Sequence, residues 1–72
     1  MEVSLDLIRL LLARLEKISA DSVWAHRASG VRGSLIRAAE KIEDDKRVSA
    51  SDLKGLMELG FYILEQAAKE RS

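Results

Sequence analysis

The amino-acid sequence predicts an all-α fold, an antiparallel three-helix up-down-up bundle, and three observations support this prediction. The 72 residues contain no proline, and no stretch alternates polar and apolar residues as a strand would. Apolar side chains instead recur every three or four residues in three separate segments, which is the spacing of one helix face. A chain this short buries only about 60% of its unfolded surface, so we expect a single domain over residues 1–72. Short connections then make consecutive helices antiparallel.

The first helix is expected over about residues 3–18, where leucine dominates the sequence. Its expected core row is Leu5, Ile8, Leu12 and Leu15. Val3, Leu7 and Leu10 lie on roughly the opposite side and widen the apolar arc to about 200°. Either the two neighbouring helices or a partner covers such an arc, and the sequence leaves both explanations open.

The second helix is expected over about residues 22–44, with Asp21 or Ser22 as the N-terminal cap. Its expected core row is Trp24, Ala28, Val31, Leu35, Ala38 and Ile42. This row passes through Gly30 and Gly33 without interruption, which favours one continuous helix. A break at these glycines, giving four helices, is the alternative. Trp24 either closes the end of the core or anchors a partner.

The third helix is expected over about residues 49–69, beginning at a capping box formed by Ser49 and Asp52. Its expected core row is Leu53, Met57, Gly60, Leu64 and Ala67, where Gly60 allows close approach of a neighbouring helix. Antiparallel packing against the second helix predicts two ion pairs. These pairs are Arg32 with Glu65 and Arg37 with Glu58.

The composition argues against catalysis, cofactors and metals. There is no cysteine and one histidine, His26, so the three or four nitrogen or sulfur ligands of a zinc site are missing. Ser22 and Ser29 lie within helical reach of His26, but a bundle this small offers no evident pocket for a catalytic group. Charged residues of both signs interrupt the leucine-rich first segment, which is typical of neither a signal peptide nor a membrane span. We therefore predict a cytoplasmic protein that is not an enzyme and has neither a small-molecule substrate nor a membrane partner.

The leading functional hypothesis is a protein-protein interaction or oligomerisation module, with a homodimer or larger homo-oligomer as one form. The expected partner, another protein or a second copy, contacts apolar residues of the first helix and small outward-facing residues of the second. These residues are Val3, Leu7, Leu10, Ala25, Ser29, Gly30 and Gly33.

Nucleic-acid binding is the alternative hypothesis, because residues 22–39 contain three arginines and no acid. These are Arg27, Arg32 and Arg37, and Gly30-Val31-Arg32-Gly33 has the spacing of a phosphate-cradling GXXG loop. Residues five apart turn by about 140° around a helix, so the arginines do not form one stripe. Twelve basic residues also balance twelve acidic ones, which ranks this hypothesis second.

Overall fold

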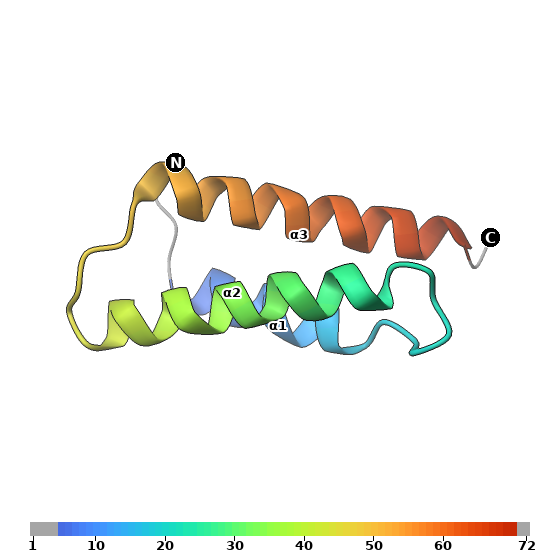
Figure 1. Cartoon of the computed structure of the whole chain (residues 1–72), viewed down its shortest axis with the longest axis horizontal. Helices are drawn as coiled ribbons and strands as arrows, with labels where there is room; N and C mark the ends of the chain where they lie inside the picture. The colour runs from blue at the N-terminus through green and yellow to red at the C-terminus, as the bar shows by residue number, and fades with distance from the viewer. Residues whose placement is uncertain (1–4, 71–72) are drawn as a thin grey trace.

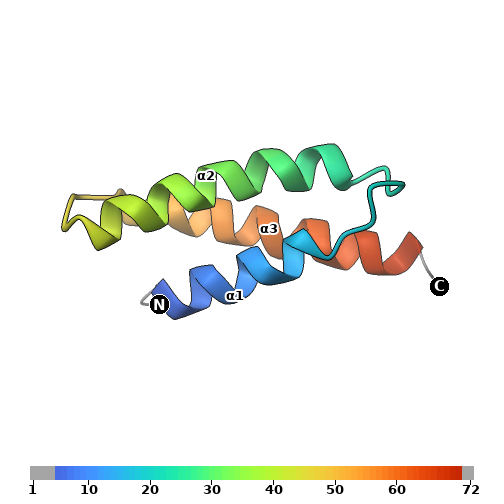
Figure 2. The same ribbon diagram turned by 90° about the horizontal axis from the view of Figure 1, so that it is seen from below.

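The computed structural model describes residues 5–70 and contains three α-helices, drawn in Figure 1. They are α1 (Leu5–Glu16), α2 (Ala25–Glu43) and α3 (Ala50–Glu70), and no strand occurs among the described residues. The connections 17–24 and 44–49 lie at opposite ends of the molecule, so α2 runs antiparallel to α1 and α3 (Figures 1 and 2). The predicted all-α, up-down-up three-helix bundle is confirmed. The bundle is elongated, with extents of 40 × 21 × 17 Å.

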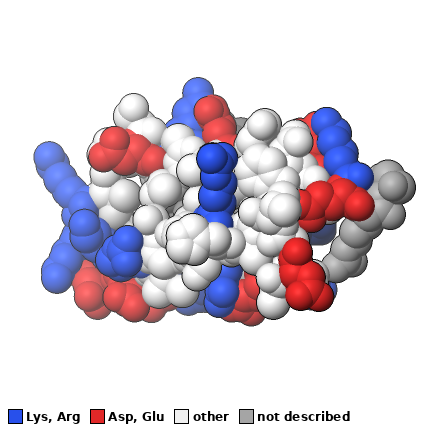
Figure 3. All heavy atoms as spheres, turned by 45° about the vertical axis from the view of Figure 1, so that its right-hand side comes forward, with Lys and Arg blue, Asp and Glu red and all other residues white. Residues whose placement is uncertain are grey.

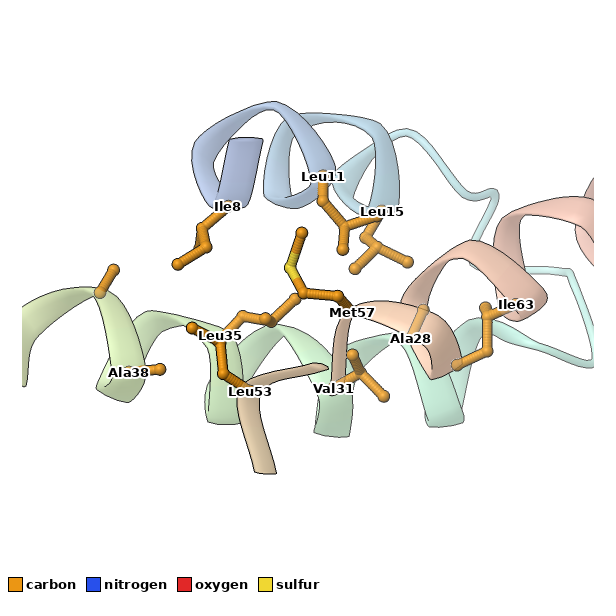
Figure 4. Close-up of a cluster of buried hydrophobic side chains, with 11 residues drawn as sticks. Ile8, Leu11, Leu15, Ala28, Val31, Leu35, Ala38, Leu53, Met57 and Ile63 are labelled. Carbon is orange, nitrogen blue, oxygen red and sulfur yellow. The ribbon is translucent and has the colours of Figure 1, made fainter. Parts of the chain in front are cut away.

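One hydrophobic core joins all three helices, and Figure 4 shows Leu11 and Leu15 pointing from α1 into it. The buried core side chains are Ile8, Leu11, Leu15, Ala28, Val31, Leu35, Ala38, Ala39, Leu53, Met57 and Ile63. The core row predicted for the first helix is one residue out of phase, because Leu11 is fully buried and Leu12 only half-buried. The cause lies on α3, where Gly60 has no side chain and leaves room for Leu11.

Helix α2 is continuous through both glycines, so the predicted alternative of a break at Gly30 and Gly33 is wrong. Neither glycine has a positive φ, and both lie inside the helix. The predicted start of this helix is also wrong, since it begins at Ala25 rather than at residue 22, and no side chain caps it. Ser22 instead accepts a hydrogen bond from the Trp24 amide at 3.1 Å and donates one to a Glu70 carboxylate oxygen at 2.7 Å.

The connection between α2 and α3 is a short, hydrogen-bonded turn. Asp45 has a φ of 59°, the left-handed conformation that often follows the last residue of a helix. The amide of Lys46 donates to the carbonyl of Lys41 at 2.8 Å and so satisfies one free carbonyl of the last turn. The Asp52 amide donates to Ser49 Oγ at 3.3 Å, which confirms Ser49 as the cap of α3.

The prediction of two ion pairs between α2 and α3 is wrong, because both arginines contact other residues. Arg32 pairs with Glu16 of α1 at 3.2 Å, and Arg37 donates to Ser34 at 3.2 Å on its own helix. Glu65 pairs with Lys69 one turn further along α3. The reason is rotational, since Arg32 lies on the side of α2 that faces α1.

Candidate protein-binding groove

An open groove runs between α2 and α3 on the side of the molecule away from α1. We refer to it as the α2/α3 groove, and its volume is about 410 Å³. The residues that line it are Arg27, Gly30, Val31, Ser34, Leu56, Leu59 and Ile63. In Figure 1, α1 lies behind α2, and α3 runs along the upper side of the pair.

The groove exists because the α2 wall is made of small residues. Gly30 and Ser34 are four apart and therefore stack on one face of α2. A Cβ added at Gly30 would have no atom within 4 Å, so the space beside this residue is open. Val31 and Ile63 are buried and form the floor, while Leu56 and Leu59 form the α3 wall. The groove is therefore apolar, and small residues make its α2 wall lower than its α3 wall.

Apolar surface remains exposed along this wall and at one end of the groove. Leu59 is 42% exposed and Tyr62 is 48% exposed. The Tyr62 and Trp24 rings meet edge to face, with centroids 5.8 Å apart and an interplanar angle of 83°. The Arg27 guanidinium lies 5.3 Å from the Trp24 ring, a cation–π distance that holds this cation at the groove. In Figure 3, uncharged side chains cover much of the middle of the face shown, and one basic side chain crosses them.

Trp24 packs against the core, as the first of its two predicted roles requires, and its role as a partner anchor stays a prediction. Its side chain is partly buried and packs against the hydrophobic core, while its ring contacts two residues beside the groove. The residue therefore fixes the position of Arg27 and Tyr62 relative to the core.

The predicted partner-binding residues of the first helix have different surroundings. Val3 lies outside the described residues. Leu7 is half-buried and packs against the core, so the fold itself covers part of the broad apolar arc. Leu10 is 51% exposed.

The predicted partner-binding residues of the second helix divide between two faces. Gly30 borders the α2/α3 groove. Around α2, Ser29 is turned about 100° from Gly30 and Gly33 about 60°, and Ala25 lies one turn before Ser29. Of these four residues, only Gly30 lines the groove.

The α3 side of the groove was missed by the sequence analysis. Leu56, Leu59 and Ile63 repeat at three and four residues, which is a second apolar row beside the predicted core row. Helices α1 and α2 leave part of this second row uncovered, since Leu59 is 42% exposed. The row itself was present in the sequence and indicates the groove wall.

The three arginines of the nucleic-acid hypothesis lie in different environments. Arg27 stacks on Trp24, and Arg32 is held by Glu16 on the opposite side of α2. Arg37 lies beside the groove, since Ser34, its hydrogen-bond acceptor, lines the wall. Only Arg27 and Arg37 therefore share a surface.

A second, more polar depression lies where the C-terminal parts of α1 and α3 meet the connection 17–24, with a volume of about 510 Å³. The Glu70 carboxylate at its edge accepts hydrogen bonds from Ser22 Oγ at 2.7 Å and from the Val23 amide at 3.3 Å. These bonds tie the connection to the end of α3. The carboxylate is thus already engaged in holding the fold.

Two further kinds of site would involve a metal ion or a lipid bilayer. Within residues 5–70, no group of three His, Cys, Asp or Glu side chains is placed to hold a metal ion. None of the helices described combines the length and the apolar character needed to cross a bilayer.

Comparison of the chain with protein-family models, curated proteins and solved structures gives no match.

Proposed function

We propose that this protein is a small helical interaction module without catalytic activity, which binds a protein partner through the α2/α3 groove. The observation that carries the proposal is the groove itself, an open apolar trough whose low wall is Gly30 and Ser34. An apolar groove between two helices is a surface on which an amphipathic helix can lay its apolar face. In keeping with the composition, we place the module in the cytoplasm.

Burial of the exposed apolar wall supplies the affinity in this proposal. Complete burial of a leucine or aromatic side chain contributes about 1.5 to 3 kcal/mol. Leu59 and Tyr62 are each nearly half exposed, so covering both contributes on the order of 2 kcal/mol. Gly30 lets a partner approach α2 closely, because a partner side chain can enter the space that a Cβ would occupy. These terms support a weak, reversible interaction.

The rival hypothesis, nucleic-acid binding, draws less support from the geometry. Phosphate binding needs several cations on one surface. Of the three arginines on α2, Arg32 is engaged with Glu16 on the side facing α1. The groove floor of Val31 and Ile63 also offers nothing to a phosphate backbone. An apolar helix surface matches this site better.

The test is an unbiased selection of helical peptides against the intact protein, with two variants of α2 as readouts. Gly30→Gln fills the groove wall, and we expect it to weaken the selected peptides about tenfold, the equivalent of about 1.4 kcal/mol. Ser29→Gln is the matched control, because it changes an exposed residue of the same helix that does not line the groove. Sedimentation velocity of the unliganded protein and of both variants tests whether a second copy occupies the same groove.

Two results would overturn the proposal. One is a set of selected peptides whose affinity is the same for Gly30→Gln and for Ser29→Gln. The other is retardation of a short RNA or DNA at low salt that is lost on Arg32→Glu, which would favour the rival hypothesis.

A further inference from the structure

We propose that the occupant of the α2/α3 groove is an amphipathic helix with acidic residues at both ends of its apolar face. This inference rests on the proposed function and names the chemistry of the partner. It follows from the charges beside the groove, which are all of one sign along the α2 wall.

The basic character of the α2 wall is a property of sequence and structure together. Arg27 is the one charged residue that lines the groove within the described part of the chain. Arg37 stands beside the other end of the wall, where it donates a hydrogen bond to Ser34. Both side chains are exposed, and helix α2 carries no acid before Glu40. An incoming anionic group therefore meets no competing carboxylate along this wall.

The acids of α3 leave this positive character intact. Glu65 is already paired with Lys69 at 3.6 Å. Glu58 lies two turns before Glu65 and so shares its face, about 150° from the buried row of α3 and turned to solvent. Neither residue lines the groove.

The spacing of the two arginines defines the partner further. Arg27 and Arg37 are ten residues apart, which is about 15 Å along a helix that rises 1.5 Å per residue. On a partner helix, residues i and i+11 lie on nearly the same face and about 16.5 Å apart. A helix with acids at i and i+11 and apolar residues between them can therefore reach both arginines while its apolar side chains meet Leu56 and Leu59.

The same charges argue against a second copy as the occupant. In a symmetric dimer formed through the groove, each α2 wall brings its own Arg27 and Arg37 to the interface. No acidic residue among the described groove residues is available to pair with them. Like charges at an interface lower affinity, whereas an acidic helix gains from both.

The experiment uses three synthetic peptides of about four helical turns that differ only at positions i and i+11. These positions carry Glu in the first peptide, Gln in the second and Lys in the third, with leucines on the face between them. Binding to the intact protein is followed by the fluorescence of Trp24, the one tryptophan of the sequence, which touches Arg27 beside the groove. Because the protein is unchanged across the series, differences between peptides do not depend on protein folding.

We expect the Glu peptide to bind about fivefold to tenfold more tightly than the Gln peptide, because rim charge pairs contribute modestly. The Lys peptide binds most weakly, and raising the salt concentration narrows the differences. The Glu peptide loses its advantage on Arg27→Gln or Arg37→Gln, with circular dichroism checking that each variant is folded. Arg47→Gln, a change in the connection 44–49, is the matched control and leaves the advantage intact.

Two results would overturn this inference but not the proposed function, and a third result would overturn both. Equal binding of the Glu and Gln peptides, both weakened by Gly30→Gln, refutes the acidic partner and leaves the groove as a protein-binding site. Dimerisation abolished by Gly30→Gln identifies a second copy instead. If Gly30→Gln changes the binding of no peptide, designed or selected, the proposed function fails as well.

Discussion

The contact between Gly60 and Leu11 leads to a sharp stability prediction. Gly60 is buried on α3, and a Cβ placed on it would lie 2.8 Å from Leu11 Cδ2 and 3.3 Å from two further Leu11 atoms. Leu11 is fully buried, so its side chain has no open space into which to move. We expect Gly60→Ala to push α1 and α3 apart or to force Leu11 out of its rotamer.

The magnitude follows from comparing this change with Gly30→Ala. Alanine is favoured over glycine inside a helix by about 0.8 to 1.0 kcal/mol, and both substitutions gain this term. Gly30→Ala meets no atom within 4 Å, so it keeps the whole gain. Gly60→Ala also suffers overpacking, which costs about 1 to 3 kcal/mol. The difference between the two variants therefore isolates the packing term, about 1 to 3 kcal/mol.

Urea and thermal unfolding followed by far-UV circular dichroism measure this difference. In a domain of this size, 1 kcal/mol corresponds to a shift in Tm of roughly 4 to 8 °C. Gly30→Ala is expected to raise Tm above that of the parent chain, and Gly60→Ala to fall below Gly30→Ala. The double change of Gly60→Ala with Leu11→Ala should be less destabilising than the sum of its parts, because contacting sites are not additive. Equal stability of Gly60→Ala and Gly30→Ala would refute the close contact.

Three further predictions concern the turn, the surface and the aromatic pair. Asp45→Gly should stabilise the fold by about 1 kcal/mol in urea unfolding, because glycine adopts the left-handed conformation without steric cost; no gain would contradict the positive φ. Arg9→Gln should lower the free energy of unfolding by no more than about 1 kcal/mol, because both side chains of the 2.7 Å Arg9–Glu43 pair are about half exposed. A larger loss in urea unfolding would contradict this. Tyr62→Ala should shift the fluorescence of Trp24 to longer wavelength by exposing its ring to water, and an unchanged spectrum would contradict the edge-to-face contact.

The helices could be predicted from the sequence because their apolar spacing is local information. The second and third core rows held for Val31, Leu35 and Met57, which are all buried. The phase of the first helix could not be fixed in the same way, because leucine or isoleucine occupies most positions from residue 5 to residue 15. Its phase depends on where Leu11 finds room, which is decided by Gly60 on another helix.

Long-range side-chain bonds account for the other differences. Ser22 has the local features of a helix cap, but Glu70, 48 residues further along the chain, accepts its hydroxyl proton. The helix consequently begins three residues later than local capping rules predict. The ion pairs failed for the same reason, since a small rotation of α2 brings Arg32 to Glu16 rather than to Glu65. The groove could not be predicted from the sequence, because its position depends on which apolar rows two packed helices leave uncovered.

Gly60, which is buried, and Gly30, which borders the groove, have different explanations. Both interrupt a sequence that otherwise favours a helix. Gly60 is explained within the fold, because a side chain there would collide with Leu11. Gly30 has no such explanation, since alanine would fit and would favour the helix by about 0.8 to 1.0 kcal/mol. A residue that lowers stability without an internal reason is the pattern expected where function trades against stability. The absence of a side chain at Gly30 opens the α2/α3 groove, which supports the proposal that this groove receives a partner.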